Sequence, residues 1–587
     1  MSLKWNLRTH DAQLIQSIER TSGVSPVVAQ LLALRGISRP DEVQSFLDLK
    51  MTGLRAPEEL PGVSKAVEVI LAAVDRSEKI FVYGDYDADG MTSTAILFLC
   101  LKELGADIHY FVPNRLDDGY GVSTANLDKL KERGAQLVVT VDCGITSVDE
   151  VEYGKRIGLP MIITDHHHVG PALPDALTIV HPGLPETPYP FAGLCGAGVA
   201  FKLAWALCTG RTGSPKLPER FRNFLFRAIS LAAIGTVCDV VPLLDENRII
   251  VHHGLNCMRK FANPGLAHLM KLSKVASKPR LDSGDIAFMV GPRLNASGRL
   301  GQAQLGVELL TCDCADRGLQ LADHIHELNK NRDSLDRKIL KSARELIEKD
   351  FDPQADPAIV VAGNDWHLGV LGIAAGRVAQ QYHRPTVLLS VDPLGSRPAV
   401  GSARSACGVN LYDAIAGSQE HLIKFGGHRA AAGLSIKPEN VDAFREDFFQ
   451  QVIEQVSVAE LIPDLDIDAE ATIGQITVSM IRDLEKLAPF GQNNPRPILC
   501  ATNVQLAEEV KTMGSEGRHL SLKLKQHSAT IRAVAFGKPE WLPKLKDTNA
   551  SYDFAFEPMV NEFRGRSSAE VKLVDFRLSQ SPVVASS

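Results

Sequence analysis

The segment 82–93, VYGDYDADGMTS, constrains this chain more than any other. It places Asp85, Asp87 and Asp89 at alternate positions, directly after the apolar run 80–82. In an extended backbone, alternate side chains point to one side about 6.7 Å apart, and each neighbouring pair of carboxylates repels by roughly 2–3 kcal/mol at an effective dielectric of about 20. We therefore expect bound positive charge at this loop.

A calcium loop of the EF-hand type is one alternative for DYDADG, since the three aspartates and Gly90 match its first ligand positions. The twelfth position is Ile96, where such a loop needs a bidentate glutamate, and the preceding residues indicate a strand instead of a helix. A second alternative, a solvated acidic turn, does not need strict alternation of aspartates. Both alternatives are therefore disfavoured.

Similar side chains follow other apolar runs. LVVTVDCG contains Asp142, MIITDHHHVG contains the Asp-His-His-His run 165–168, and AIGTVCDVVPL, also predicted as a strand, contains Asp239. Strand-like runs alternate with helical patterns, which predicts a parallel sheet whose carboxyl edge gathers these groups. Carboxylates with one or two histidines suit Mn²⁺ or Mg²⁺, and a pair of such ions activates water for attack on a phosphate. The residues alone favour a two-metal phosphoesterase.

Composition sets broad limits. The 587 residues are 45% hydrophobic and 23% charged, which predicts roughly three or four globular domains. The start is unlike a signal peptide, and no uninterrupted apolar run reaches the roughly 20 residues of a membrane helix, since the longest candidate, 229–244, contains Asp239. The ten cysteines lack paired zinc-site spacing and indicate reduced thiols. The net charge of −7 leaves a local nucleic-acid groove possible.

The predicted fold class is α/β with an added barrel. Its expected segments are an N-terminal helical segment at 1–60, a parallel-sheet domain at 61–315, a long connecting helix at 316–350, a second α/β domain at 351–460 and an OB-like β-barrel at 461–587. Apolar residues recur every three or four positions along the long helix, but Arg332 interrupts the stripe. Arg332 is either a snorkelling side chain or a phosphate contact. Period-two alternation in HLSLKLK and ATIRAVAFG predicts barrel strands.

The motifs DYDADG, VDCG, TDHH and GTVCDVV occur in an order that resembles the DHH phosphoesterase superfamily, named for its Asp-His-His triplet. Within it, the chain is most similar to the RecJ exonucleases over nearly its whole length. This similarity is carried by VVAQLLALRGI, by NRLDDGYGVS at 114–123, by GPRLNASGRLG at 291–301 and by FGGHRAAAG at 425–433. Short superfamily members lack the GPRLNASGR block and the C-terminal barrel.

The resemblance implies roles for individual residues. The metal ligands would be Asp85, Asp87, Asp89, Asp142, His166 and Asp239, holding two divalent cations, Mn²⁺ or Mg²⁺. His167 would contact the phosphate or protonate the leaving oxygen, Asp165 would orient a histidine, and His168 would have no essential role. Phosphate or DNA contacts are expected at Arg293, Ser297, Arg299, Arg377, Ser402, Arg404, Gly426, Gly427 and His428.

The C-terminal barrel is similar to an OB fold, which binds single strands through stacking and a positive groove. Candidate contacts are the phenylalanines Phe554, Phe556 and Phe563 beside Arg564 and Arg566. Phenylalanines in a small barrel more often form its core.

The resemblance implies an exonuclease that removes 5′ mononucleotides processively from single-stranded DNA in the 5′-to-3′ direction, in recombination, repair and mismatch repair. It implies a monomer in the bacterial cytoplasm, associated with the nucleoid and not with a membrane, that works with single-strand-binding protein and a RecQ-type helicase. Two alternatives stay open: a phosphodiesterase for short oligonucleotides, and a noncatalytic replication scaffold with the same fold. All the expected ligands are present, which disfavours the scaffold.

Overall fold

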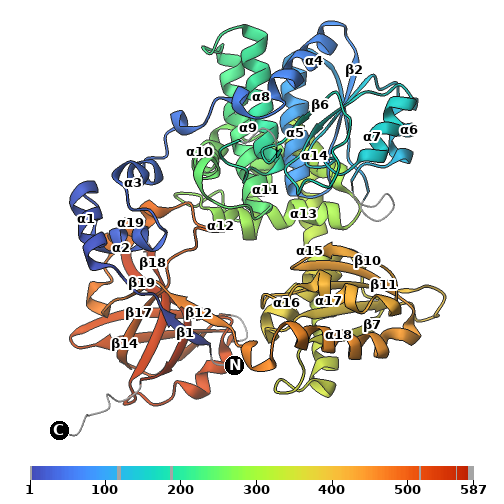
Figure 1. Cartoon of the computed structure of the whole chain (residues 1–587). Helices are drawn as coiled ribbons and strands as arrows, with labels where there is room; N and C mark the ends of the chain where they lie inside the picture. The colour runs from blue at the N-terminus through green and yellow to red at the C-terminus, as the bar shows by residue number, and fades with distance from the viewer. Residues whose placement is uncertain (1–2, 115–120, 186–188, 515–516, 564, 580–587) are drawn as a thin grey trace. The chain divides into compact units, whose positions relative to one another are not determined.

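The computed structural model describes residues 3–114, 121–185, 189–514, 517–563 and 565–579 (Figure 1). The chain divides into two compact units. The larger unit is Leu54–Ile462, and the barrel unit combines Met1–Gly53 with Pro463–Ser587.

The first sheet of the larger unit is parallel, which confirms the predicted fold class. Its strand order is β3-β2-β4-β5-β6. The strands are β2 (Lys79–Tyr83), β3 (Asp107–Phe111), β4 (Leu137–Thr140), β5 (Met161–Thr164) and β6 (Thr178–Val180). The strands β4 and β5 are buried at every position, which explains why their sequences are continuous apolar runs instead of alternating patterns.

Helices follow and enclose these strands. They are α4 (Val63–Asp75), α5 (Ala88–Glu103), α6 (Thr124–Glu132), α7 (Val148–Arg156), α8 (Gly196–Thr212), α9 (Glu219–Cys238), α10 (Asp245–Phe261), α11 (Pro264–Leu272), α12 (Ser283–Asp285), the π-helical turn η3 (Ile286–Val290), α13 (Gly291–Arg299) and α14 (Ala303–Thr311). The helix α5 packs against α8 and α9.

The segment before Asp239 is helical, which corrects the predicted strand. AIGTVC forms the end of α9, and Asp239 is its C-cap residue. The error arose because a short apolar run does not by itself distinguish a buried strand from a buried helix. By length and composition α9 is apolar enough to cross a membrane, which a count of uninterrupted apolar residues overlooked. It packs against α5, α8 and α10 with most of its apolar stretch buried, as a core helix does.

One continuous helix, α15 (Ala315–Asp350), links the first α/β domain to a second one. The second domain contains β7 (Ile359–Asn364), α16 (Leu368–Tyr382), β8 (Thr386–Val391), β9 (Ala399–Arg404), α17 (Leu411–Gly417), β10 (Leu422–His428), β11 (Ala431–Ile436) and α18 (Val441–Gln455). Its strand order is β10-β11-β9-β8-β7, in which β7 and β8 are parallel and the other neighbours antiparallel. The FGGHRAAAG block forms the hairpin of β10 and β11.

The barrel unit contains elements from both ends of the chain. These are β1 (Lys4–Leu7), α1 (Ala12–Ser22), α2 (Pro26–Leu34), α3 (Pro40–Leu47), β12 (Asp464–Ile467), β13 (Ala469–Glu470), α19 (Val478–Leu484), β14 (Leu499–Leu506), β15 (Lys511–Met513), β16 (His519–Gln526), β17 (Ala529–Phe536), β18 (Tyr552–Phe563) and β19 (Arg566–Leu578). The sheet has the order β13-β14-β18-β19-β17-β16-β15, and a pairing of β14 with β16 closes it. Strand β1 pairs with β12, and Trp5 Nε1 donates a hydrogen bond to Asp575.

Two of the barrel phenylalanines lie in the core, as phenylalanines in a small barrel usually do. Phe554 and Phe556 are fully buried in the barrel core, so in this structure neither ring is available to stack on a base. Arg566 is exposed. The side chain of Phe563, and Arg564, lie outside the described residues.

Candidate metal centre

The aspartate loop joins β2 to α5. Asp87 is the N-cap residue of α5, and its carboxylate accepts hydrogen bonds from the backbone N–H groups of Asp89 and Gly90 at 2.9 and 3.0 Å. A capping carboxylate satisfies N–H groups that the helix leaves unpaired, and the helix dipole favours negative charge there. The local fold thus stabilises carboxylates that would otherwise repel one another.

Helix α8 approaches the same loop with its N-terminus. Asp89 accepts hydrogen bonds from the N–H groups of Gly196 and Ala197 at 2.7 and 2.9 Å. A Cβ atom on Gly196 would lie 2.7 Å from the Cβ and Oδ1 atoms of Asp142. Only glycine therefore lets the helix come this close to both aspartates.

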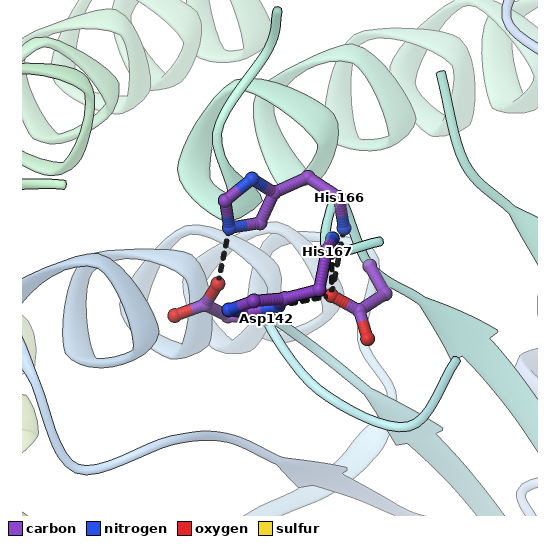
Figure 2. Close-up of side chains that lie close together, drawn as sticks. Asp142, His166 and His167 are labelled. Atoms are coloured by element: carbon purple, nitrogen blue, oxygen red, sulfur yellow. Dashed lines mark hydrogen bonds and ion pairs between the residues drawn. The ribbon is translucent and has the colours of Figure 1, made fainter. Parts of the chain in front are cut away.

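His166 lies where separate elements converge (Figure 2). Its Nε2 atom is 3.0 Å from Asp142 Oδ1, 3.6 Å from Asp239 Oδ2 and 3.8 Å from Asp89 Oδ2. Asp85, Asp87 and Asp142 form a neighbouring set whose ligand atoms lie within 4.8 Å of one another. The six side chains expected as metal ligands therefore form two adjacent sets, made up of Asp89, His166 and Asp239, and of Asp85, Asp87 and Asp142.

Negative charge accumulates in this cluster. Burial raises the pKa of Asp142 well above its usual value, and the charges of Asp89, Asp87 and Asp85 raise it further. Burial, followed by the charges of Asp89 and Asp87, raises the pKa of Asp239 to about 9. Burial lowers the pKa of His166. The cluster favours added protons or added cations.

Two atoms show which of these fits. Asp142 Oδ1 and His166 Nε2 are buried and lie 3.0 Å apart as an ion pair, and neither atom has a hydrogen-bond partner among the described residues. Buried lone pairs of this kind are costly unless something coordinates them. Because the ligand atoms are carboxylate and imidazole atoms without thiolates, the cluster fits divalent Mn²⁺ or Mg²⁺.

Asp165 holds the next histidine. Its Oδ1 atom accepts a hydrogen bond from His167 Nδ1 at 2.7 Å, and its Oδ2 atom accepts one from the Ile145 N–H at 2.9 Å. Burial alone would lower the pKa of His167, but the hydrogen bond and charge of Asp165, aided by Asp239 and Asp89, raise it to about 9. His167 is 41% exposed, so its ring is accessible, and His168 is exposed.

His181 was not expected from the sequence. It follows β6 directly and is almost fully buried. Its Nδ1 atom accepts a hydrogen bond from the Gly183 N–H at 2.9 Å, so its Nε2 atom carries the proton and donates it to the His167 carbonyl at 2.8 Å. The signal that could have revealed it is its position at the same sheet edge as Asp142 and Asp165.

The GPRLNASGR block supports the aspartate loop. Asn295 Oδ1 accepts a hydrogen bond from the Ala88 N–H at 2.8 Å. A Cβ atom on Gly298 would lie 2.0 Å from the Tyr86 carbonyl oxygen, so α13 can pack here only with glycine. Ser297 is fully buried and donates to the Leu294 carbonyl at 2.7 Å. Because α13 turns this hydroxyl inward, the expected phosphate contact of Ser297 is wrong for this structure.

The other expected phosphate residues lie in several places. Arg293 is half-buried and donates from Nε to His326 at 3.1 Å, and Arg404 Nη1 donates to Ser402 Oγ at 3.0 Å. Arg377 on α16 forms an ion pair with Asp336. Gly426, Gly427 and His428 are exposed at the end of β10, and Arg299 ends α13. Their contacts with DNA stay predictions, and residues 115–120 of the NRLDDGYGVS block lie outside the described residues.

Comparison with known proteins identifies the domains. Three family models match the chain: the DHH family N-terminal domain at residues 79–236, the DHHA1 domain at 356–455 and the RecJ OB domain at 467–575. The last two models cover the second α/β domain and the barrel.

Relatives match along almost the whole chain. The single-stranded-DNA-specific exonuclease RecJ of Bacillus subtilis is 36% identical, over 98% of this chain and 71% of that protein. The protein of the same description from Salmonella typhimurium is 34% identical, over 98% of this chain and 99% of its own length. The crystal structure of RecJ from Thermus thermophilus in complex with Mn²⁺ superposes with a TM-score of 0.81 at 29% identity, covering 98% of this chain and 80% of that one. Its Mg²⁺ complex gives a TM-score of 0.75 at 28% identity over 98% of this chain and 79% of that one. In sequence, domain content and fold, this chain belongs to the RecJ family of the DHH phosphoesterases.

Proposed function

We propose that this protein is a metal-dependent exonuclease that hydrolyses single-stranded DNA. The observation that carries the proposal is the buried pair Asp142 Oδ1 and His166 Nε2, two ligand atoms 3.0 Å apart within a cluster of carboxylates. Two divalent ions bound there would lower the pKa of a water molecule and neutralise charge on the phosphate. Asp89, His166 and Asp239 would hold one ion, and Asp85, Asp87 and Asp142 would hold the other.

His167 is the proposed proton donor to the leaving oxygen. Asp165 holds the Nδ1–H of the ring, and we propose Nε2 as the atom that donates a proton to the substrate. A water oxygen forms a bond to phosphorus, the bond between phosphorus and the 3′ oxygen of the terminal nucleotide breaks, and that 3′ oxygen takes the proton from His167. The products are a 5′ mononucleotide and a strand shortened by one residue.

Several finer features of the proposal rest on family membership. These are the 5′-to-3′ direction, processive release, and exclusion of duplex by a narrow passage between the two α/β domains. We further propose action in recombination and mismatch repair in the bacterial cytoplasm, at the nucleoid. Single-strand-binding protein and a RecQ-type helicase are the proposed partners.

End-labelled substrates test the proposal. The purified protein is incubated with Mn²⁺ and single strands labelled at either end, beside duplex and RNA controls. We expect the 5′ label to be released first, as a mononucleotide, by the wild type and by His168→Ala, but not by Asp87→Ala or Asp142→Ala. Activity confined to oligonucleotides of a few residues would instead indicate a short-oligonucleotide phosphodiesterase. No turnover of any phosphodiester would indicate a scaffold, and full activity of Asp142→Ala would refute the assigned site.

A further inference from the structure

The connecting helix α15 carries two buried charges that the metal centre does not use. Arg332 is only 9% exposed and Asp336 is fully buried. The helix packs against α13 of the first α/β domain and α16 of the second. Arg332 is therefore not a snorkelling side chain with its charge in water, which favours the phosphate contact over the snorkelling alternative.

Arg332 has no carboxylate partner of its own. Within the described part of the chain it makes one hydrogen bond, from Nη2 to Asn329 Oδ1 at 2.6 Å, and no ion pair within 4.0 Å. Burial lowers its pKa, and the charges of Asp333 and Asp336 offset this in part. A buried guanidinium paired only with an amide is costly, and its remaining N–H groups suit the oxygens of an anion.

Asp336 is the counter-ion that several arginines share. Its Oδ2 atom forms an ion pair with Arg377 Nη1 at 2.5 Å, and among the described residues neither oxygen meets the geometry of a hydrogen bond. The charges of Arg332 and Arg299 also act on this carboxylate. The charges of three arginines thus act on this one carboxylate, and we call Arg299, Arg332, Asp336 and Arg377 the connecting-helix cluster.

The cluster adjoins the support of the metal centre. Arg299 follows Gly298, whose backbone contacts the carbonyl of Tyr86 in the aspartate loop. The carbonyl of Arg299 also abuts α16, where a Cβ atom on Gly369 would lie 2.2 Å from it. The two α/β domains therefore meet at this cluster, next to the glycine that contacts the loop carrying three of the metal-binding carboxylates.

We propose that Arg332 binds a backbone phosphate of single-stranded DNA, and that Asp336 is a positioning residue that holds Arg377 toward the same strand. The inference rests on the proposed function and names a phosphate subsite for it. A phosphodiester supplies the single negative charge and the paired oxygens that an arginine fork binds. The subsite contributes affinity for the strand and takes no part in bond cleavage, so its loss raises KM and leaves kcat near the wild-type value.

Binding without metal tests Arg332 directly. Fluorescence anisotropy of a labelled oligothymidylate of about 20 nucleotides is measured in EDTA at several salt concentrations. We expect Arg332→Gln to bind roughly tenfold more weakly, with a salt slope smaller by about 0.7. The matched control is Arg337→Gln, which removes a 71% exposed arginine from the same helix and is expected to bind within about twofold of wild type. If melting shows that Arg332→Gln is unfolded, Arg332→Lys keeps the charge but not the fork and is expected to bind more weakly than wild type.

The outcomes separate the two proposals. The phosphate subsite would be overturned if Arg332→Gln bound the strand with wild-type affinity and salt slope. Where Arg332→Gln is unfolded, wild-type affinity of Arg332→Lys would overturn it. Neither result would affect the proposed nuclease function. A wild-type protein that neither binds the strand in EDTA nor cuts it with Mn²⁺ would overturn the proposed function, and this inference with it.

For Asp336, the positioning role and the simple loss of a negative charge predict opposite changes in DNA affinity. Removing a negative charge near a phosphate would by charge alone tighten binding. We expect Asp336→Asn to bind several-fold more weakly instead, because Arg377 loses its anchor, and we expect Asp336→Asn combined with Arg377→Gln to bind no more weakly than Arg377→Gln alone. Tighter binding by Asp336→Asn, or additive losses in the double variant, would overturn the positioning role.

Discussion

Asp165 and His167 are joined by a 2.7 Å hydrogen bond between Oδ1 and Nδ1, and the same carboxylate oxygen accepts the backbone N–H groups of both histidines in the triplet. One buried group therefore fixes the backbone of the triplet and the orientation of the His167 ring. Burial alone would raise the pKa of Asp165, but the hydrogen bond from His167 and the nearby positive charge lower it to about 2. Asp165 thus stays ionised throughout the neutral range.

The alkaline limit of activity should depend on Asp165. In the metal-free protein the hydrogen bond and the charge of Asp165 raise the pKa of His167 to about 9, and Asp165→Asn removes that charge. A proton donor must be protonated, so kcat falls as the pH rises through the pKa of His167, and this fall should move to lower pH by about one unit or more in the variant. The measurement is kcat against pH with Mn²⁺ saturating. An unchanged alkaline limb, with His168→Asn as control, would remove His167 from the role of proton donor.

His181 should hold the Asp-His-His triplet in place through its two hydrogen bonds. Substitutions that keep or remove these hydrogen bonds can separate this role from the space that the side chain fills. Asparagine offers both a donor for the His167 carbonyl and an acceptor for the Gly183 N–H, whereas leucine offers neither. Each buried group left unsatisfied costs roughly 1–3 kcal/mol. We expect His181→Leu to lower kcat by about tenfold or more and to lower the melting temperature, and His181→Asn to restore most of both. Equal kcat in the two variants would show that the hydrogen bonds do not matter.

Gly298 should be indispensable to the aspartate loop. In Gly298→Ala the new Cβ would lie 2.0 Å from the Tyr86 carbonyl, so either α13 or the loop must shift. We expect weaker Mn²⁺ binding by calorimetry and a loss of stability of about 2 kcal/mol or more. The matched control is Gly376→Ala, also within a helix, where the nearest atom would lie 3.8 Å away and the change should be neutral or stabilising. Identical Mn²⁺ affinity in Gly298→Ala and wild type would contradict the support role of α13.

The predictable part of the structure is the part that residue pattern controls. The strands β2, β4 and β5 are continuous apolar runs because they are buried, and the long helix shows its apolar stripe. The meeting of Asp85, Asp142 and His166 follows from the rule that parallel strands end at one edge. The element before Asp239 is a helix and not the predicted strand, because a short apolar run has no periodicity that distinguishes a buried helix from a buried strand.

The unpredictable part depends on contacts with backbone groups. His181 binds a carbonyl and Asn295 binds an N–H group that lies 207 positions away in the chain. Every residue has a backbone N–H or carbonyl group, so the sequence does not show which one a side chain will bind. Ser297 was misassigned for the same reason, since a polar residue in a glycine-rich block looks like a ligand contact until the helix shows which way it faces.

The carboxylate of Asp142 should stabilise the folded protein when metal is bound and destabilise it when metal is absent. In the metal-free protein this buried carboxylate faces the charges of several aspartates, which with burial raise its pKa well above the unfolded value. The folded state then binds more protons than the unfolded state, so stability is lost as the pH rises from the unfolded pKa toward the folded one. At neutral pH in EDTA, Asp142→Asn should therefore be more stable than wild type, by about 1–2 kcal/mol.

Bound metal should make the wild type more stable than Asp142→Asn, which reverses the order expected in EDTA. Cations bound by the carboxylates stabilise the folded state in proportion to their affinity, and the asparagine variant loses a central ligand. We expect Mn²⁺ to raise the melting temperature of the wild type by several degrees and that of Asp142→Asn far less, while Asp149→Asn, an exposed change at the start of α7, should follow the wild type in both conditions. Thermal melting with EDTA and with Mn²⁺ makes the comparison. If Asp142→Asn melts below the wild type in EDTA, the carboxylates do not destabilise the metal-free protein by repelling one another, and this prediction is wrong.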